Sequence, residues 1–153
     1  MAPSGRQQSK SDMKKKVLIV DDEDSIRWII ERKVTKDRYE VVACASYEEA
    51  LRATRKSTPD LILSDYNLSQ KEDGIDLAQA IIKRTKKAIP VIIMSGYKEC
   101  HERVQASRFE YLPKPFDLNQ LMLLIRDALA KPPRTNRRSK HHRINEMLAA
   151  AGR

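Results

Sequence analysis

Residues 17–130 alternate between two patterns of apolar and polar positions. Short unbroken apolar runs, such as Val17-Leu18-Ile19-Val20, are typical of strands buried on both faces of a sheet. Between these runs, apolar residues recur every three or four positions, as in helices with one buried face. The runs predict strands at 17–20, 39–43, 61–63, 89–94 and 109–112. The stretches between them predict helices at 25–36, from 46 until Pro59, at 75–86, at 98–107 and from 117 onward.

The order of these elements predicts the fold class. Successive strands that are joined through helices run parallel, and the helices cover both faces of the sheet. We therefore predict an α/β fold with a doubly wound, five-stranded parallel sheet. Ser46 and Glu49 have capping-box spacing at the start of one helix, and Pro132-Pro133 ends the last helix.

Positive charge is concentrated at the two ends of the chain. The formal net charge is +9 at pH 7, yet residues 17–130 contain 18 basic and 19 acidic side chains. We expect one domain over 15–130, between basic disordered tails at 1–14 and 131–153, with a short helix at 143–151. Solvated tails are the simplest interpretation. Weak contact with nucleic acid, an anionic membrane surface or an acidic protein is the alternative.

The sequence shows no export signal and no membrane span. Its apolar runs fall far short of the roughly 18–20 residues that a spanning helix needs, and the basic N-terminus has no apolar signal-peptide core. Cys44 and Cys100 are the two cysteines. We expect them to be packed rather than paired, and we expect a cytoplasmic location.

Charged and polar side chains follow four of the five predicted strands. Asp21 and Asp22 come after the first strand, Asp65 after the third, Ser95 after the fourth and Lys114 after the fifth. In an open α/β sheet, ligands bind outside the carboxyl ends of the strands. The fold would therefore bring these residues together at one edge, although they are far apart in the sequence.

This combination of residue types indicates a particular chemistry. Three clustered carboxylates repel one another unless a cation lies among them, and hard oxygen ligands suit Mg²⁺. One carboxylate could attack phosphorus and form an acyl phosphate. The charge on a transferred phosphoryl group would then be held by Mg²⁺, the Ser95 hydroxyl and the Lys114 ammonium.

Four segments carry a resemblance to a known family. Residues 17–23, 61–67, 94–97 and 111–116 resemble, in order, the signature segments of the response-regulator receiver domain of two-component signalling systems. The resemblance covers residues 15–130. It implies a flavodoxin-like (βα)₅ fold with strand order 2-1-3-4-5, and phosphorylation by a histidine kinase or phosphotransfer protein, with signalling to a downstream effector protein.

The resemblance also implies a role for each residue at the strand ends. Asp65 would be the phosphoacceptor, and Lys114 would contact the phosphoryl group. Ser95 would be the switch hydroxyl, where the family more often has Thr, and Tyr111 the switch aromatic, although a core position is an equal alternative for Tyr111. The Lys114-Pro115 bond would be cis. The implied Mg²⁺ ligands are Asp22, Asp65, the backbone carbonyl of Asn67, and Asp21, the last closely or through water.

The sequence departs from the family pattern in two places. The loop between Asp65 and Gly74 lacks the usual Pro and is about one residue longer, which should loosen it. The step from Ser95 to Lys114 is about three residues shorter than usual, and Ala106-Ser107-Arg108 replaces the usual turn. We therefore expect a fourth helix shortened by about a turn, and a monomer rather than the family's usual dimer.

We predict a stand-alone receiver that catalyses only its own phosphorylation and dephosphorylation. One alternative is a phosphatase of the haloacid dehalogenase type, with Asp22 of Asp22-Glu23-Asp24 as nucleophile. Against it, Ile26 stands where that class has Thr or Val. The other alternative is a nucleic-acid adaptor that acts through its basic tails. Trp28 and Phe116 are interpreted as packing residues.

Overall fold

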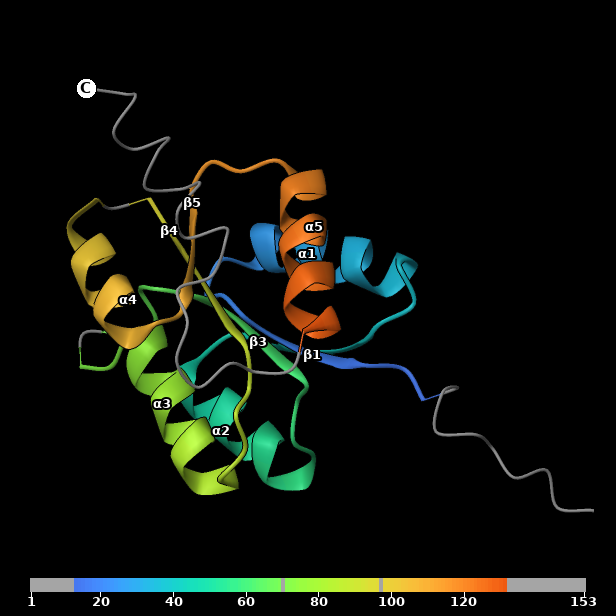
Figure 1. The fold of residues 1–153 in the computed structure, drawn as a ribbon, viewed down its shortest axis with the longest axis horizontal. Helices are drawn as coiled ribbons and strands as arrows, with labels where there is room; N and C mark the ends of the chain where they lie inside the picture. The colour runs from blue at the N-terminus through green and yellow to red at the C-terminus, as the bar shows by residue number, and fades with distance from the viewer. Residues whose placement is uncertain (1–12, 70, 97, 132–153) are drawn as a thin grey trace, which may run out of the picture.

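The sheet is built from short apolar strands that all run in the same direction. A computed structural model describes residues 13–69, 71–96 and 98–131, and its strands lie in the order β2-β1-β3-β4-β5 (Figure 1). This confirms the predicted fold class and strand order. The bounds are Lys16–Val20 for β1, Glu40–Cys44 for β2, Leu61–Asp65 for β3, Val91–Ser95 for β4 and Glu110–Pro113 for β5.

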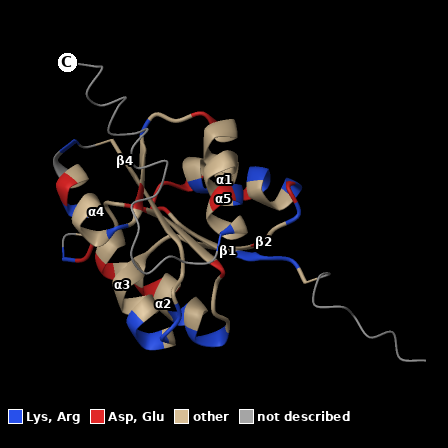
Figure 2. Ribbon diagram, viewed as in Figure 1, with Lys and Arg blue, Asp and Glu red and all other residues tan. Residues whose placement is uncertain are grey.

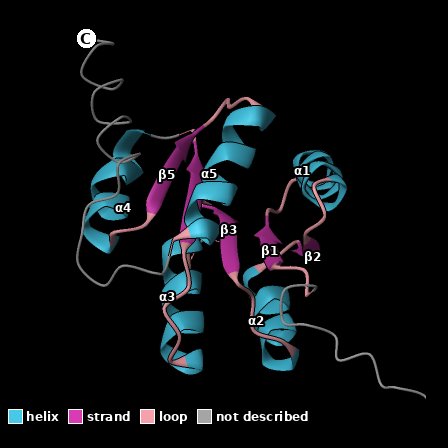
Figure 3. Cartoon of the chain, turned by 45° about the vertical axis from the view of Figure 1, so that its right-hand side comes forward, coloured by secondary structure: helices cyan, strands magenta, loops and turns pink. Residues whose placement is uncertain are grey.

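Helices cover both faces of this sheet. Their bounds are Asp24–Lys36 for α1, Tyr47–Lys56 for α2, Gly74–Thr85 for α3, His101–Ser107 for α4 and Leu118–Ala130 for α5. Helices α1 and α5 lie on one face, and α2, α3 and α4 lie on the other (Figures 1 and 3). Alternate residues of each strand feed the two resulting cores. In β1, Leu18 packs toward α2 and α3, whereas Ile19 packs toward α1 and α5.

Side-chain caps begin three of the helices. The Ser46 hydroxyl accepts a hydrogen bond from Glu49 N at 3.2 Å, as the capping spacing predicted. The Asp117 carboxylate caps α5 by accepting a hydrogen bond from Asn119 N at 2.6 Å. The capping box of α3, between Asp73 and Asp76, was not predicted from the sequence. It fixes the point where the β3–α3 loop becomes helix.

The structure corrects one prediction about packing. Trp28 is 56% exposed rather than buried, whereas Phe116 packs against the core as predicted. Ile26 and Ile30 face inward on α1, and a residue two positions from each lies on the opposite side of a helix. The apolar character of Trp28 therefore suggested a buried position, whereas the helical periodicity of α1 predicts the exposed position that the structure shows. Cys44 and Cys100 are both buried, and no disulfide joins them, as expected.

The segment between β4 and β5 is short, as predicted. A 3₁₀ turn at Lys98–Cys100 leads into α4, which has only 7 residues. Arg108, the residue directly after α4, adopts the left-handed conformation with φ 65°. This conformation is strained in any residue other than glycine, because the Cβ crowds the carbonyl that follows.

Several sequence-based predictions concern residues outside the described ranges. These are most of the two basic tails, the predicted helix at 143–151, and Tyr97 of the third signature segment. Within the ranges that are described, no helix has both the length and the apolar character needed to cross a bilayer. The cytoplasmic location and the role of the tails remain predictions.

Candidate functional site

Three carboxylates meet at the carboxyl end of the sheet. Asp21 and Asp22 follow β1, and Asp65 is the last residue of β3. Because β1 and β3 are neighbouring parallel strands, their ends meet, and one oxygen from each of the three carboxylates lies within 4.8 Å of the other two. Among the described residues, this is the one such group of acidic, His or Cys side chains. Figure 2 shows the acidic stretch that leads from β1 into α1.

Asp21 is fully buried and fixed by its surroundings. Its Oδ1 accepts a hydrogen bond from Glu23 N at 2.9 Å, and its backbone oxygen accepts one from Arg27 at 2.7 Å. Asp65 is also buried, whereas Asp22 is exposed. The cluster therefore has a rigid inner wall and one side that is open to solvent. Hard oxygen donors in this arrangement fit a small divalent cation that keeps some of its waters.

Lys114 supplies the positive charge beside these carboxylates. Its Nζ lies 3.4 Å from Asp21 Oδ2 and 3.4 Å from Asp65 Oδ1. Its backbone N donates to Ser95 O at 2.8 Å, which fixes the loop after β5 against the end of β4. The Lys114-Pro115 peptide bond is cis, as the resemblance implied.

The electrostatics of Asp65 are dominated by burial. Burial raises the pKa of this carboxyl to about 6, and the carboxylates of Asp21 and Asp22 add to the shift, while Lys114 opposes it. The pKa of Lys114 is also raised: burial lowers it, but Asp65 and Asp21 together outweigh burial. A carboxyl that is costly to ionise gains from any further cation that enters the cluster.

Ser95 and Tyr111 lie next to this cluster on β4 and β5. Ser95 is 1% exposed, and its backbone oxygen accepts a hydrogen bond from the Tyr111 hydroxyl at 3.3 Å. The Tyr111 ring is buried and lies 5.0 Å from the His101 ring, measured between centroids. Burial raises the pKa of Tyr111 to about 12, and the neighbouring Cys100 adds a smaller contribution in the same direction. The aromatic ring therefore points inward in this conformation.

Asn67 lies in the β3–α3 loop, residues 66–73, and is exposed. This loop is closed at its base, where Asn67 pairs with Asp73 and Gly74 N donates to Tyr66 O at 2.8 Å. Gly74 is a site residue that the sequence analysis treated only as the end of the loop before a helix. A Cβ at this position would lie 2.2 Å from Asp65 O, so only glycine fits against the phosphoacceptor candidate.

Arg103 of α4 is a second residue that the sequence analysis missed. Its guanidinium donates to the Tyr66 hydroxyl at 3.1 Å, forms an ion pair with Asp73, and lies 3.5 Å from Asp76 Oδ1. No local motif signals these contacts, because the residues that make them come from separate elements.

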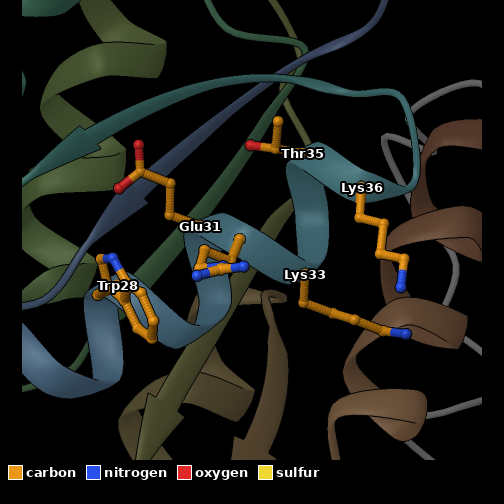
Figure 4. A pocket seen from close by; sticks show the side chains of 6 residues that line it. Trp28, Glu31, Lys33, Thr35 and Lys36 are labelled. Atoms are coloured by element: carbon orange, nitrogen blue, oxygen red, sulfur yellow. The ribbon is translucent and has the colours of Figure 1, made fainter.

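Two hollows flank α1. One, shown in Figure 4, is lined by Trp28, Glu31, Arg32, Lys33, Thr35 and Lys36, with the Arg32 guanidinium 4.7 Å from the Trp28 ring centroid. None of the clustered carboxylates lines it. The other is a largely apolar groove that reaches Lys114 and is lined by Ile26, Ile29, Ile30, Lys114, Pro115, Phe116 and Leu118. The acidic cluster thus lies outside the first hollow, and Lys114 is the one residue of the candidate site that lines the second.

The acidic cluster and Lys114 lie together at the carboxyl edge of a doubly wound parallel sheet. Proteins with this arrangement form a class whose sites suit cations and phosphoryl groups. Comparison with known proteins specifies the family. The profile of the response regulator receiver domain matches residues 17–126, and the chain belongs to this family. Phosphorylation and Mg²⁺ binding are typical of it. The match decides against the haloacid dehalogenase alternative.

Two of the similar curated proteins are transcriptional regulators. The DNA-binding transcriptional regulator NtrC of Proteus hauseri is 39% identical over 119 residues, which cover 74% of this chain and 24% of that protein. The probable transcriptional regulator ycf27 of Pyropia yezoensis is 35% identical over 77% of this chain and 49% of its own length. The chain thus spans about a quarter to a half of the length of these relatives.

Solved structures agree with the family assignment. The chemotaxis protein CheY4 of Vibrio cholerae matches with a TM-score of 0.69 and 28% identity, over 76% of this chain and all of that one. The response regulator TrrA of Thermotoga maritima, in complex with Mg²⁺ and BeF, matches with a TM-score of 0.67 and 26% identity. That match covers 75% of this chain and 99% of TrrA.

Proposed function

We propose that this chain is a phosphorylation switch that accepts a phosphoryl group on Asp65 in the presence of Mg²⁺. The observation that carries the proposal is the meeting of Asp21, Asp22 and Asp65 within 4.8 Å, with Lys114 3.4 Å from two of them. These are the residue types that a transferred phosphoryl group requires. The TrrA structure with Mg²⁺ and BeF supports the same use of the fold.

In this proposal each residue of the site has a defined task, and Asp65 has two. An Asp65 oxygen attacks phosphorus as the P–N bond of a phosphohistidine breaks, and the electron pair of that bond stays on the imidazole. Lys114 and the Ser95 hydroxyl bind the phosphoryl oxygens. Mg²⁺, when bound, supplies positive charge to the same oxygens. The residues that would hold it are Asp22, Asp65, the backbone carbonyl of Asn67, and Asp21, the last closely or through water.

The partners follow from this chemistry. The donor is a histidine kinase or a phosphotransfer protein, and a downstream effector protein reads the phosphorylated surface. In this proposal Ser95 and Tyr111 carry the change from Asp65 to that surface. It acts as a phosphoacceptor and catalyses only its own phosphorylation and dephosphorylation.

Metal binding provides the first test. Mg²⁺ that binds the folded state alone should raise the melting temperature by mass action. Asp22→Ala should abolish this rise, because Asp22 is the carboxylate on the open side of the cluster. Asp24→Ala is the matched control, since Asp24 is exposed and pairs with Arg27 at the start of α1. An undiminished Mg²⁺ effect in Asp22→Ala would contradict the site.

Phosphorylation provides the second test. Acetyl phosphate with Mg²⁺ should add one acid-stable, alkali-labile phosphoryl group to the wild-type chain, detected by intact mass. Asp65→Asn should add none. Full labelling of that variant, or labelling mapped to Asp22, would overturn the assignment of the phosphoacceptor.

A further inference from the structure

The β3–α3 loop carries two groups that the proposed function uses. Asp65 lies directly before it, and the carbonyl of Asn67 lies within it. Residue 74 fixes the other end, because the Gly74 Cα approaches the Asp65 backbone too closely to admit a Cβ. The sequence of this loop contains no proline that would restrict its backbone. Its shape is therefore set by hydrogen bonds within the loop, such as those that the Ser69 hydroxyl accepts from Lys71 N and Glu72 N, together with contacts from other elements.

Arg103 provides such a contact from α4. The guanidinium donates to the hydroxyl of Tyr66 at the start of the loop and pairs with the carboxylate of Asp73 at its end. A second nitrogen lies 3.5 Å from Asp76, the partner of Asp73 in the α3 capping box. A planar guanidinium with five donors can make all three contacts at once, which an ammonium on a flexible stem cannot do in the same way.

We infer that Arg103 is a positioning residue: it clamps the two ends of the β3–α3 loop together and so holds Asp65 and Asn67 in place for the cation. It acts only through Tyr66, Asp73 and Asp76 and touches no reacting atom. This inference rests on the proposed function, since the cation site is the property that the clamp serves. It also joins α4 to the loop, so cation binding should in turn tighten α4 by thermodynamic linkage.

The clamp should affect binding more than overall stability. The Arg103 side chain is 53% exposed, so solvent screens its ion pairs and their loss should change global stability little. The loop, in contrast, has more conformational freedom without the clamp, so cation binding must then overcome a larger loss of conformational entropy. We expect at least about a fivefold weaker Mg²⁺ affinity, at the lower end of typical coupling between sites.

The experiment compares Arg103→Gln with Arg126→Gln, each in the 153-residue chain. Arg126 is a matched control because its side chain is 58% exposed and forms one ion pair, with Asp37, far from the loop in sequence. Two quantities are measured: the Mg²⁺ dissociation constant by calorimetry, and amide hydrogen exchange of residues 66–73 without metal. Arg103→Gln should weaken Mg²⁺ binding and speed exchange in the loop, and Arg126→Gln should change neither. Arg103→Lys should fall between wild type and Arg103→Gln.

A double-mutant cycle tests whether Arg103 acts on the loop through the Tyr66 hydroxyl. Tyr66→Phe removes only the hydroxyl that accepts from Arg103, so its effect and that of Arg103→Gln should not add. Equal Mg²⁺ affinity or equal loop exchange in wild type and Arg103→Gln would overturn the inference alone. If the unaltered chain binds no Mg²⁺, the proposed function fails and the inference fails with it.

Discussion

At the scale of single residues, the candidate site depends on a close approach between two backbones. Gly74 begins α3 directly against the carbonyl of Asp65, and the Ser64 hydroxyl would lie 2.8 Å from a Cβ at that position. Both neighbours are held in the buried strand β3 and have little freedom to move aside. The identity of residue 74 is thus dictated by the position of the phosphoacceptor candidate.

We predict that Gly74→Ala destabilises the chain by about 2 kcal/mol, the usual cost of forcing extra volume into a packed site. Urea unfolding measures the change. Gly96→Ala is the control, because the nearest atom to a Cβ there, Lys114 Cβ, lies 4.0 Å away. That variant should stay within roughly 0.5 kcal/mol of wild type. Equal stability of the two variants would mean that the close approach is absent in solution.

A second prediction at this scale concerns Tyr111, whose pKa is raised by burial to about 12. A raised pKa means that the folded state holds the proton more tightly than the unfolded state, where tyrosine ionises near pH 10. Tyr111 therefore stabilises the fold fully below about pH 10, and this contribution is lost as the pH rises toward 12.

The test is the pH dependence of unfolding in wild type and Tyr111→Phe. Above pH ~10, the free energy of unfolding should fall more steeply in wild type than in the variant. Parallel curves would show that the hydroxyl is solvated, and that the inward position of Tyr111 is not its resting state.

At the scale of elements, the strands were easier to predict than the contacts between helices. The apolar run at Val17–Val20 gave β1 to within one residue, because burial on both faces leaves a signal in consecutive positions. The carboxyl ends of parallel strands meet at one edge of the sheet. The positions of Asp21, Asp22, Asp65 and Lys114 directly after predicted strands were therefore enough to predict that they lie together. The clamp formed by Arg103 did not, because it depends on side-chain geometry between α4 and the loop.

Helix α4 carries a prediction about backbone strain. Arg108, directly after this helix, has φ 65°, a conformation that glycine adopts without steric cost. We predict that the free energy of unfolding of Arg108→Gly is about 0.5–1 kcal/mol higher than that of Arg108→Ala, because both variants lose the Arg side chain and only Ala keeps the Cβ that crowds the backbone. Thermal or urea unfolding measures it.

The control lies two residues earlier. Ala106→Gly, at an exposed position inside α4, should instead destabilise by about 1 kcal/mol, because glycine is a poor helix former. If Arg108→Gly is no more stable than Arg108→Ala, residue 108 is not left-handed in solution.

At the scale of the whole molecule, the short α4 bears on assembly. In the family, α4, β5 and α5 form a common dimer face, and here α4 has only 7 residues. A two-fold interface uses the same surface twice, so a shortened helix removes contacts from both copies. We predict a monomer both with and without a beryllofluoride mimic of the phosphoryl group, measured by analytical ultracentrifugation with Mg²⁺.

The contrary outcome is a dimer that appears with the mimic. If Leu123→Glu abolished such a dimer, the α5 face would be the interface, since Leu123 of α5 is 59% exposed. That result would show that the shortened α4 does not prevent the family's usual assembly.

The exposed indole of Trp28 has a consequence for spectroscopy. It is the chain's only tryptophan, it is 56% exposed on α1, and the Arg32 guanidinium lies 4.7 Å from its ring centroid. Its fluorescence should therefore have the red-shifted maximum of an indole in water and be quenched readily by iodide, which the neighbouring cation attracts. Any molecule that covers this side of α1 should shift the emission to the blue and protect it from quenching. The chain thus carries an intrinsic, label-free reporter for occupancy of its α1 surface.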